Sequence, residues 1–385
     1  MLLFNVFLLC IWSFGLSLVL FGTYRALRHL NQAPPHMDAP FGLYPVSVLK
    51  PVKGNEPLLK ESLETFFHLD YPTYEIIFSV AHANDPARFV IERLCREYPG
   101  VPARLLIGEV KIGINPKVNN MVQSYKAARY DWILISDSNI RVKPDYLKRL
   151  VGHLDSGVGV LTAIVAGREA RQLGGLLEST FLNTFYARWM ILTSLFGRPC
   201  VVGKSMLFRK STAERFGGLQ TLAKYLAEDY MTGEAMQLLG YRVVVMHDVV
   251  EQPIGEYSFN SFWARHLRWG RIRKMHAPVA FVFEPWFNSL LSGVLGAISL
   301  NHFFGIDPYL LFSTHMLIWF VCDFLLLQRL EPEWGFRHLV AWLVRESLSF
   351  PQWIHTLCGN TIQWRGSQLR LKRGGLVESV EMATK

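Results

Sequence analysis

The chain has 385 residues, half of them hydrophobic, and a formal net charge of +9 at pH 7. This length allows two or three structural units with an ample core, and the hydrophobic share is high for a purely soluble protein. The basic residues cluster beside apolar segments, so we expect membrane lipid and a nucleotide as anionic partners and no nucleic acid. The five cysteines are scattered without a C-x-x-C pair, which argues against a zinc site and a disulfide framework.

The first segment is an uncharged apolar run, Met1 to Tyr24, long enough to span a bilayer. A cleaved signal peptide is the alternative, but no basic residue precedes the run and no small-x-small cleavage site follows it. The basic flank Arg25-Ala26-Leu27-Arg28-His29 comes after the run, so the positive-inside rule places the rest of the chain in the cytoplasm. We therefore predict a transmembrane anchor over residues 1–30.

Strand and helix patterns alternate after a Pro-containing linker, Gln32 to Gly42. Strands are predicted at 46–49, 74–80, 104–107 and 132–135, with helices at 57–69, 88–98 and 117–129 between them. Such alternation predicts an α/β fold with a doubly wound, mostly parallel, Rossmann-like sheet.

The segment that follows the strand Trp132 to Ile135 carries the first candidate site. The strand is a short apolar run without alternation, which is typical of a strand buried on both faces. Ligands of open α/β sheets bind just outside the carboxyl ends of the strands. Asp137 and Asn139 lie there and could both face one hard cation, such as Mg²⁺, which completes its shell with water and substrate phosphates. The alternative is that Asp137 starts a turn or caps a helix.

Other polar residues fall on the same side of the predicted sheet. Asp85 ends the strand 74–80, where it is also a good turn residue, and Glu228 and Asp229 open a helix, where they could simply complement the helix dipole. Lys117 starts the helix 117–129 and could meet a phosphate there or be an ordinary solvated lysine.

The second half is less regular. Strands are predicted at 158–165, 201–209 and 241–246, a helix at 227–239, and an apolar, aromatic helix near the membrane at 175–195. The helix 259–274 interleaves basic residues with Phe and Trp, a pattern typical of a membrane-surface helix.

The C-terminal region is apolar again. Segments 287–304 and 309–327 are near the minimum spanning length, and the absence of Lys and Arg between them predicts an outward hairpin. The segment 339–358 is interrupted by Arg345, Glu346 and Pro351, which favours an interfacial or re-entrant piece. The tail 364–385 is basic and then polar. We expect three domains: the anchor 1–30, a catalytic domain 31–280 ending in the basic interfacial helix, and a membrane region with cytoplasmic tail, 281–385.

Several motifs resemble the ceramide glucosyltransferases, membrane-bound inverting GT-A enzymes that move glucose from UDP-glucose to ceramide. They include Gly113-Ile114-Asn115-Pro116-Lys117-Val118-Asn119-Asn120, Asp137-Ser138-Asn139-Ile140-Arg141-Val142, Tyr225-Leu226-Ala227-Glu228-Asp229-Tyr230 and Arg265-His266-Leu267-Arg268-Trp269. The resemblance covers nearly the whole chain in the right order. It implies a GT-A fold, a UDP-sugar donor, a ceramide-like lipid acceptor, a divalent metal (Mg or Mn) and a cytoplasm-facing integral membrane enzyme.

The resemblance also implies roles for individual residues. Asp85 would contact the uridine, Asp137 would serve the metal and diphosphate, and Asp229 would be the base that removes the acceptor proton. Arg268 and Trp269 fall on the family's Arg-Trp pair, which holds the diphosphate and the acceptor end.

Further candidates complete the expected site. Lys117 is a donor-binding candidate, Asn139 the second metal ligand, and the acceptor-side candidates are Glu228, Arg265 and Lys204. Two departures from the family stand out. Asn139 replaces a glycine common after Asp-Ser, and Lys204 stands where animal members usually carry methionine.

Three other functions compete. Gly197 to Ser205 looks like the phosphate loop of a nucleotidase, but five residues rather than four separate its glycines and a strand follows. A non-catalytic membrane scaffold would use the acids only as turn and cap residues. A bacterial relative would move another sugar, such as N-acetylglucosamine from its UDP form, to another lipid, such as a hopanoid polyol, because donor sugars are distinguished by few pocket contacts.

Overall fold

The computed structural model describes residues 1–33, 43–197, 200–364 and 367–379. Most of the predicted linker, residues 34–42, lies outside these ranges. So do Arg198 and Pro199 of the phosphate-loop-like run, Arg365 and Gly366, and the tail from residue 380 onward.

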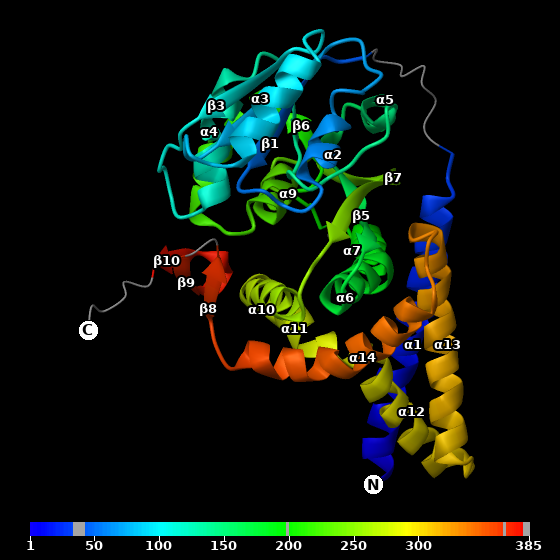
Figure 1. The fold of residues 1–385 in the computed structure, drawn as a ribbon. Coiled ribbons are helices and arrows are strands. Elements are labelled where there is room, and N and C mark those ends of the chain that lie inside the picture. Colours follow the sequence, from blue (N-terminus) through cyan, green and yellow to red (C-terminus); the bar gives the residue numbers. More distant parts are fainter. Residues whose placement is uncertain (34–42, 198–199, 365–366, 380–385) are drawn as a thin grey trace.

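A seven-stranded sheet forms the centre of the domain at the top of Figure 1, with strand order β3-β2-β1-β4-β6-β5-β7. The strands are β1 (Val46–Val52), β2 (Tyr74–Val80), β3 (Ala103–Ile107), β4 (Trp132–Ile135), β5 (Val158–Ala170), β6 (Met206–Arg209) and β7 (Arg242–Gly255). Only β6 runs antiparallel to its neighbours, β4 and β5; the other pairs are parallel. The predicted mostly parallel sheet is therefore confirmed.

Helices cover both faces of this sheet because β1, β2 and β4 are buried along their whole length. On one face pack α2 (Leu59–Glu64), α3 (Ala87–Glu97) and α5 (Tyr146–Val151). On the other pack α4 (Pro116–Ala127), α8 (Lys210–Glu214), the 3₁₀ turn η2 (Leu219–Lys224) and α9 (Glu228–Leu238). These two layers fix the loops at the carboxyl ends of the strands, where the predicted site residues lie.

Several predicted boundaries differ from the structure. The helix expected at 57–69 is reduced to α2, and the strand expected at 201–209 begins only at Met206, because residues 201–205 form an irregular loop and turn. The apolar helix expected at 175–195 is α6 (Leu173–Phe181) and α7 (Ala187–Leu195), joined by a π-helical turn η1 (Leu182–Tyr186). Such π turns often mark functional sites.

Two helices in the described part of the chain are long and apolar enough to cross a membrane: α1 (Leu2–Leu30) and α13 (Pro308–Leu330). The expected span 287–304 is shorter than predicted, since α12 (Ser289–Phe304) has 16 residues. It meets α11 (Pro278–Phe283) and the 3₁₀ turn η3 (Glu284–Phe287) at a bend of 69°. The bend follows from Asn288, whose side chain accepts the Leu291 N–H and so starts a new helix.

The C-terminal end of α1 packs on the domain that holds the seven-stranded sheet (Figure 1). Ala26 and Leu30 are buried against β5, α7 and the end of α13. The His29 ring contacts the Met246 carbonyl of β7 at 3.0 Å. The end of α1 is therefore part of the framework of the sheet domain.

Buried ion pairs join the membrane helices to α7. Arg188 on α7 and Asp323 on α13 are each 1% exposed and form an ion pair. Arg188 Nε also donates to Thr23 Oγ1 of α1 at 3.0 Å, and Trp342 Nε1 donates to Asp323 Oδ2 at 2.7 Å. One network thus ties four helices together, because Trp342 belongs to α14 (Phe336–Leu357).

We expect Arg188→Met to destabilise the protein by about 3–5 kcal/mol, because it leaves the buried Asp323 carboxylate without its main cation. Thermal unfolding of the detergent-solubilised protein measures this loss. The double variant Arg188→Met, Asp323→Leu should recover most of it, because no unpaired charge remains. A double variant no more stable than Arg188→Met would contradict this explanation.

The basic helix α10 (Phe259–His276), for which the sequence predicts a place on the membrane surface, packs along part of its length against other helices of the protein. It lies between the sheet domain and α14 (Figure 1), and several of its basic side chains contact other parts of the protein. Arg273 pairs with Glu284 at 2.6 Å, and Lys274 donates to the carbonyls of Thr356 and Gly359. An amphipathic pattern indicates that a helix has two unlike neighbours and does not distinguish a membrane from a second helix.

The segment expected to be interfacial or re-entrant is the single helix α14, which crosses beneath α6 and α10. After it comes a small sheet that the sequence did not predict, with strands β8 (Thr361–Trp364), β9 (Ser367–Leu371) and β10 (Val377–Ser379). Its apolar residues Ile362 and Leu369 are buried with Leu226, just before α9. This small sheet therefore packs beside the start of α9, where Glu228 and Asp229 lie.

Candidate functional site

The loop after β4 is held from within the sheet by Lys50. This lysine lies on β1, is fully buried, and donates from Nζ to the Asp137 carbonyl at 2.7 Å and to Ser136 Oγ at 3.2 Å. Its ammonium group also lies 3.7 Å from the centre of the Phe66 ring. Because both loop residues are bonded to one buried side chain, the position of Asp137 is fixed by the sheet.

Lys117 joins two of the predicted acids. Its Nζ lies 2.8 Å from Asp137 Oδ1 and 2.9 Å from Glu228 Oε1. Asn115 caps α4 by accepting the N–H groups of Lys117 and Val118, and its amide donates to Glu228 Oε2 at 2.9 Å. The start of α4 is thus tied to the start of α9, and Lys117 is a charged bridge between them.

The loop before β6 brings Lys204 to the same place. Lys204 Nζ donates to Asn139 Oδ1 at 3.0 Å and lies 3.6 Å from Asp137 Oδ2. Burial, with the charges of Arg265 and Lys117, lowers the pKa of Lys204 to about 8, against the opposing effects of Asp137 and Glu56. The predicted metal ligands Asp137 and Asn139 therefore converge on one cation, which in this structure is an ammonium group.

Asp229 lies in the first turn of α9, next to this cluster. Its carboxylate accepts the N–H groups of Gly203 and Tyr230, each at 2.8 Å. A Cβ atom at Gly203 would lie 2.6 Å from Lys117 Nζ, so glycine permits this close approach. Burial and the neighbouring charge of Glu228 together raise the pKa of Asp229 to about 6, against the lowering effects of Lys117 and the two backbone N–H groups. A carboxylate with this pKa is suited to accept a proton near neutral pH.

Two residues of α10, Arg265 and His266, contact Glu178 on α6. Arg265 lies 4.4 Å from the Trp269 ring centre, and its Nε is 3.3 Å from Glu178 Oε1. His266 Nε2 contacts the other oxygen of Glu178 at 2.8 Å. Burial opposes ionisation of Glu178, but Arg265 and His266 outweigh it and lower its pKa to about 2. A permanently charged Glu178 thus orients Arg265, whose own pKa is affected by the charge of Asp137.

Two predicted residues lie apart from this group. Asp85 sits at the same edge of the sheet, two strands from β4, and its carboxylate accepts the N–H groups of Gly54 and Ala87. Arg268 is half-buried on α10 and its charge acts on Tyr257. The structure brings Asp137, Lys117, Lys204, Asn139, Glu228 and Asp229 together through direct contacts, and Asp85 remains with its own loop.

The prediction from sequence missed Lys50, Asn115, Glu178 and Gly203. For Glu178 a signal existed, since it is the only acidic residue in the apolar stretch 175–195. Ionisable residues in such stretches are rarely placed without a partner. Lys50 contacts residues 86 and 87 positions away, and Gly203 contacts residues 86 and 26 positions away; no local pattern encodes such spacings.

A divalent metal fits this site only together with a substrate. The described residues contain no group of three or more His, Cys, Asp and Glu side chains that could hold a metal ion. However, Mg²⁺ commonly binds one or two protein carboxylates and completes its shell with phosphate oxygens and water. The oxygens of Asp137 and Asn139, which already converge on the Lys204 ammonium, match that donor set.

Comparison with known proteins places this site in context. The family model described as glycosyl transferase family 21 matches residues 7–377. Ceramide glucosyltransferase 1 of Caenorhabditis elegans is 30% identical over 371 residues, which cover 95% of this chain and 78% of that protein. The ceramide glucosyltransferase of Komagataella phaffii is 29% identical over 436 residues, covering 89% and 84% of the two chains.

Among solved structures, a mannosyltransferase from Pyrobaculum calidifontis, in complex with GDP-Man and Mn²⁺, superposes with a TM-score of 0.52. It is 17% identical, and the match covers 92% of this chain and 94% of that one. At this identity the similarity concerns the fold, which is that of GT-A glycosyltransferases.

Proposed function

Because the chain belongs to glycosyl transferase family 21, we propose that it transfers glucose from UDP-glucose to the primary hydroxyl of ceramide, with inversion, giving glucosylceramide. The observation that carries this proposal is the pairing of one proton acceptor with a cluster of cations. Burial raises the pKa of Asp229 to about 6, and the charge of Lys117 acts on this carboxyl group, while Lys117 and Lys204 both contact Asp137. Glycosyl transfer needs both: a base for the acceptor hydroxyl and positive charge for the departing diphosphate.

We assign the base role to Asp229. Its neighbour Glu228 forms an ion pair with Lys117 and accepts a hydrogen bond from Asn115. Glu228 therefore positions the Lys117 ammonium group, and its charge raises the pKa of Asp229. A single base on the face opposite the leaving group inverts the anomeric carbon, and no second carboxylate needs to act as a nucleophile.

We assign the donor diphosphate to the cations around Asp137. Lys117 and Lys204 stand on either side of its carboxylate, and Arg265 is held near it by Glu178, with the Arg268-Trp269 pair following on the same helix. A divalent metal, if bound with the donor, would be held by Asp137 and Asn139 and would neutralise charge on the diphosphate. Asp85, at the same sheet edge, is the candidate for the uridine.

The membrane geometry supports a lipid acceptor. Two helices can cross a membrane, and α1 packs directly against β7 and α7 of the catalytic domain. We place this domain on the cytoplasmic face, because basic residues lie in the last turns of α1 and α13, Arg28 and His29 in α1 and Arg329 in α13.

The function is tested by incubating membranes that contain the protein with labelled UDP-sugars and a panel of lipids. We expect UDP-glucose and ceramide to give β-glucosylceramide, identified by mass spectrometry and by the anomeric proton coupling. A lipid product absent from the whole panel would overturn the function, and an α-linked product would overturn the inverting mechanism. Transfer of N-acetylglucosamine to a hopanoid polyol would support the alternative function in place of glucosylceramide synthesis.

Lys204→Met tests how this chain combines a lysine with a metal at Asp137. Removing the ammonium frees Asp137 Oδ2 and Asn139 Oδ1, so we expect Mn²⁺ to bind the UDP complex about tenfold more tightly, the effect of one charge-assisted hydrogen bond. UDP binding in EDTA should weaken, because one cation near the diphosphate is lost. Mn²⁺ titration followed by electron paramagnetic resonance and UDP calorimetry measure the two effects. Unchanged Mn²⁺ affinity would show that the metal does not share these oxygens.

A further inference from the structure

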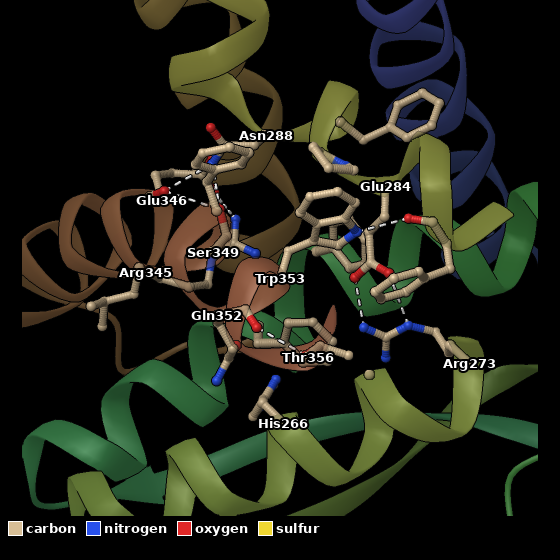
Figure 2. A pocket seen from close by; sticks show the side chains of 18 of the residues that line it. His266, Arg273, Glu284, Asn288, Arg345, Glu346, Ser349, Gln352, Trp353 and Thr356 are labelled. Carbon is tan, nitrogen blue, oxygen red and sulfur yellow. Dashed lines mark hydrogen bonds and ion pairs between the residues drawn. The ribbon is translucent and has the colours of Figure 1, made fainter. Parts of the chain in front are cut away.

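A pocket separate from the Asp137–Asp229 cluster lies where α10 meets α11 and α14 (Figure 2). Its volume is about 70 Å³, several times the roughly 10–15 Å³ that one water molecule requires. It opens at the junction of the catalytic domain and the membrane helices. A ligand segment larger than water can therefore enter at this junction.

The pocket has aromatic walls. They are formed by Phe181, Phe185, Phe262, Phe281, Phe350 and Trp353. Trp353 stacks between Phe281 and Phe350, with ring centres 5.6 Å and 6.0 Å away. Such walls stabilise a hydrocarbon segment by removing its surface from water.

Two donors in this pocket lack partners. Gln352 Nε2 and Arg345 Nε are buried and have no hydrogen-bond partner among the described residues. Arg345 as a whole is only 7% exposed, and in Figure 2 the Gln352 amide points from α14 toward His266 on α10. Buried donors left unpaired are costly, so a ligand oxygen facing these two groups would be stabilised.

The charges around the pocket balance. Arg273 is paired with Glu284 at 2.6 Å, and Arg345 is paired with Glu346. The four charged side chains of the lining thus sum to zero, leaving no excess positive charge for a phosphate group. This favours a neutral ligand with amide or hydroxyl oxygens over an anionic phospholipid.

The pocket lies beside surfaces suited to a bilayer. On α11, Val279 and Val282 are 70% and 57% exposed, and on α14, Phe350 and Ile354 are 40% and 42% exposed. Exposed apolar faces on two helices beside the transmembrane helices are typical of contact with lipid. A membrane lipid can therefore reach the pocket without crossing water.

The pocket also connects to the candidate catalytic site. His266 forms part of its wall and contacts Glu178, and Glu178 holds Arg265 beside Trp269. Arg265 and His266 are adjacent on α10. A ligand that contacts His266 in the pocket therefore lies close to Arg265, whose charge interacts with Asp137.

We propose that this pocket binds part of the acceptor lipid. A hydrocarbon segment lies among the aromatic rings, and an amide or hydroxyl oxygen of the lipid backbone accepts from Gln352 and Arg345. The assignment rests on the proposed function, because it takes the acceptor to be a neutral lipid such as an N-acylated amino alcohol.

Photocrosslinking with a diazirine-bearing ceramide tests the assignment without requiring turnover. With the full-length protein in phosphatidylcholine vesicles, we expect crosslinked peptides from α10 and α14, removed by excess ceramide and kept in excess phosphatidylglycerol. Gln352→Leu should reduce the labelling and raise the KM for ceramide about fivefold, the effect of one hydrogen bond, with the KM for the UDP-sugar unchanged. Gln328→Leu, the same change on an exposed part of α13, is the matched control and should alter neither value.

The possible results of this experiment test the lipid pocket and the proposed function independently of each other. Glucosylceramide formation with crosslinks confined to other helices would overturn the pocket and leave the function standing. Equal competition by phosphatidylglycerol, or unchanged labelling and KM in Gln352→Leu, would also overturn it. Ceramide-specific labelling of α10 and α14 without sugar transfer to any lipid would support the site and overturn the proposed reaction.

Discussion

Asp229→Asn is expected to lower kcat by about 10²–10⁴-fold, the usual contribution of a positioned general base. The asparagine oxygen can still accept the Gly203 N–H, so the loop that carries Lys204 should keep its place. The amide cannot take a proton from the acceptor hydroxyl, so only the proton-transfer step is lost. Initial rates of glucosylceramide formation, at saturating UDP-glucose and ceramide, measure the effect.

The pH dependence of the unsubstituted protein should report the same group. With a pKa of about 6, Asp229 is ionised above that pH, so kcat/KM should rise with unit slope up to about pH 6 and then level off. Glu228→Gln removes a charge that raises this pKa, and should move the acid limb to lower pH. If the acid limb does not move in Glu228→Gln, it reports the ionisation of a group other than Asp229.

Stability provides the control for Asp229→Asn. A carboxyl group whose pKa is raised on folding stabilises the protein when protonated, and this contribution is lost as pH rises from about 4 to about 6. The variant lacks that titration, so at pH 7 it should unfold at a temperature no lower than the unsubstituted protein. An inactive variant that also unfolds early would point to a structural role for Asp229.

Local sequence patterns predicted much of this architecture. The strand Trp132 to Ile135 and the polar residues after it were predicted correctly, because a strand buried on both faces has a distinct composition. The same holds for the alternation that gives β1 to β4 and for the anchor α1. These features depend on hydrophobic periodicity, which lies within the sequence window itself.

Contacts between distant segments could not be predicted in this way. The sequence suggested Lys117 as a phosphate ligand or a solvated lysine, and the structure makes it a bridge between Asp137 and Glu228. The sequence suggested Lys204 as an acceptor-side candidate and a departure from the family, but its contact with Asn139 depends on an irregular loop that was predicted as a strand. The small sheet after α14 was missed because its strands are short and only partly apolar.

Asp137→Asn is expected to have the second large effect, a loss of donor binding together with a loss of stability. The change removes the carboxylate that pairs with Lys117 and Lys204 and that would hold a metal with Asn139. Lys117 keeps its ion pair with Glu228. Lys204 stays buried and keeps its hydrogen bond to Asn139 Oδ1, but it loses its ion pair with Asp137. We expect UDP affinity in the presence of Mn²⁺ to fall at least tenfold and unfolding free energy to drop by about 2 kcal/mol, the cost of a buried donor without its charged partner.

The stability loss has a pH dependence that identifies Lys204. Without Asp137 the pKa of Lys204 falls below its value of about 8, so the folded variant releases this proton at a lower pH than the unsubstituted protein. The unfolded chain keeps the lysine charged until about pH 10. The stability gap between the two proteins should therefore narrow as pH rises toward about 8.

A double variant separates structure from function at this position. Asp137→Asn, Lys204→Met carries no unpaired ammonium group, so it should recover most of the lost stability. It also has neither the carboxylate for a metal nor the second cation for the diphosphate, so UDP binding and sugar transfer should stay low. Recovery of stability together with activity would mean that Asp137 acts only by neutralising Lys204, and the assignment of Asp137 to the donor diphosphate would have to be given up.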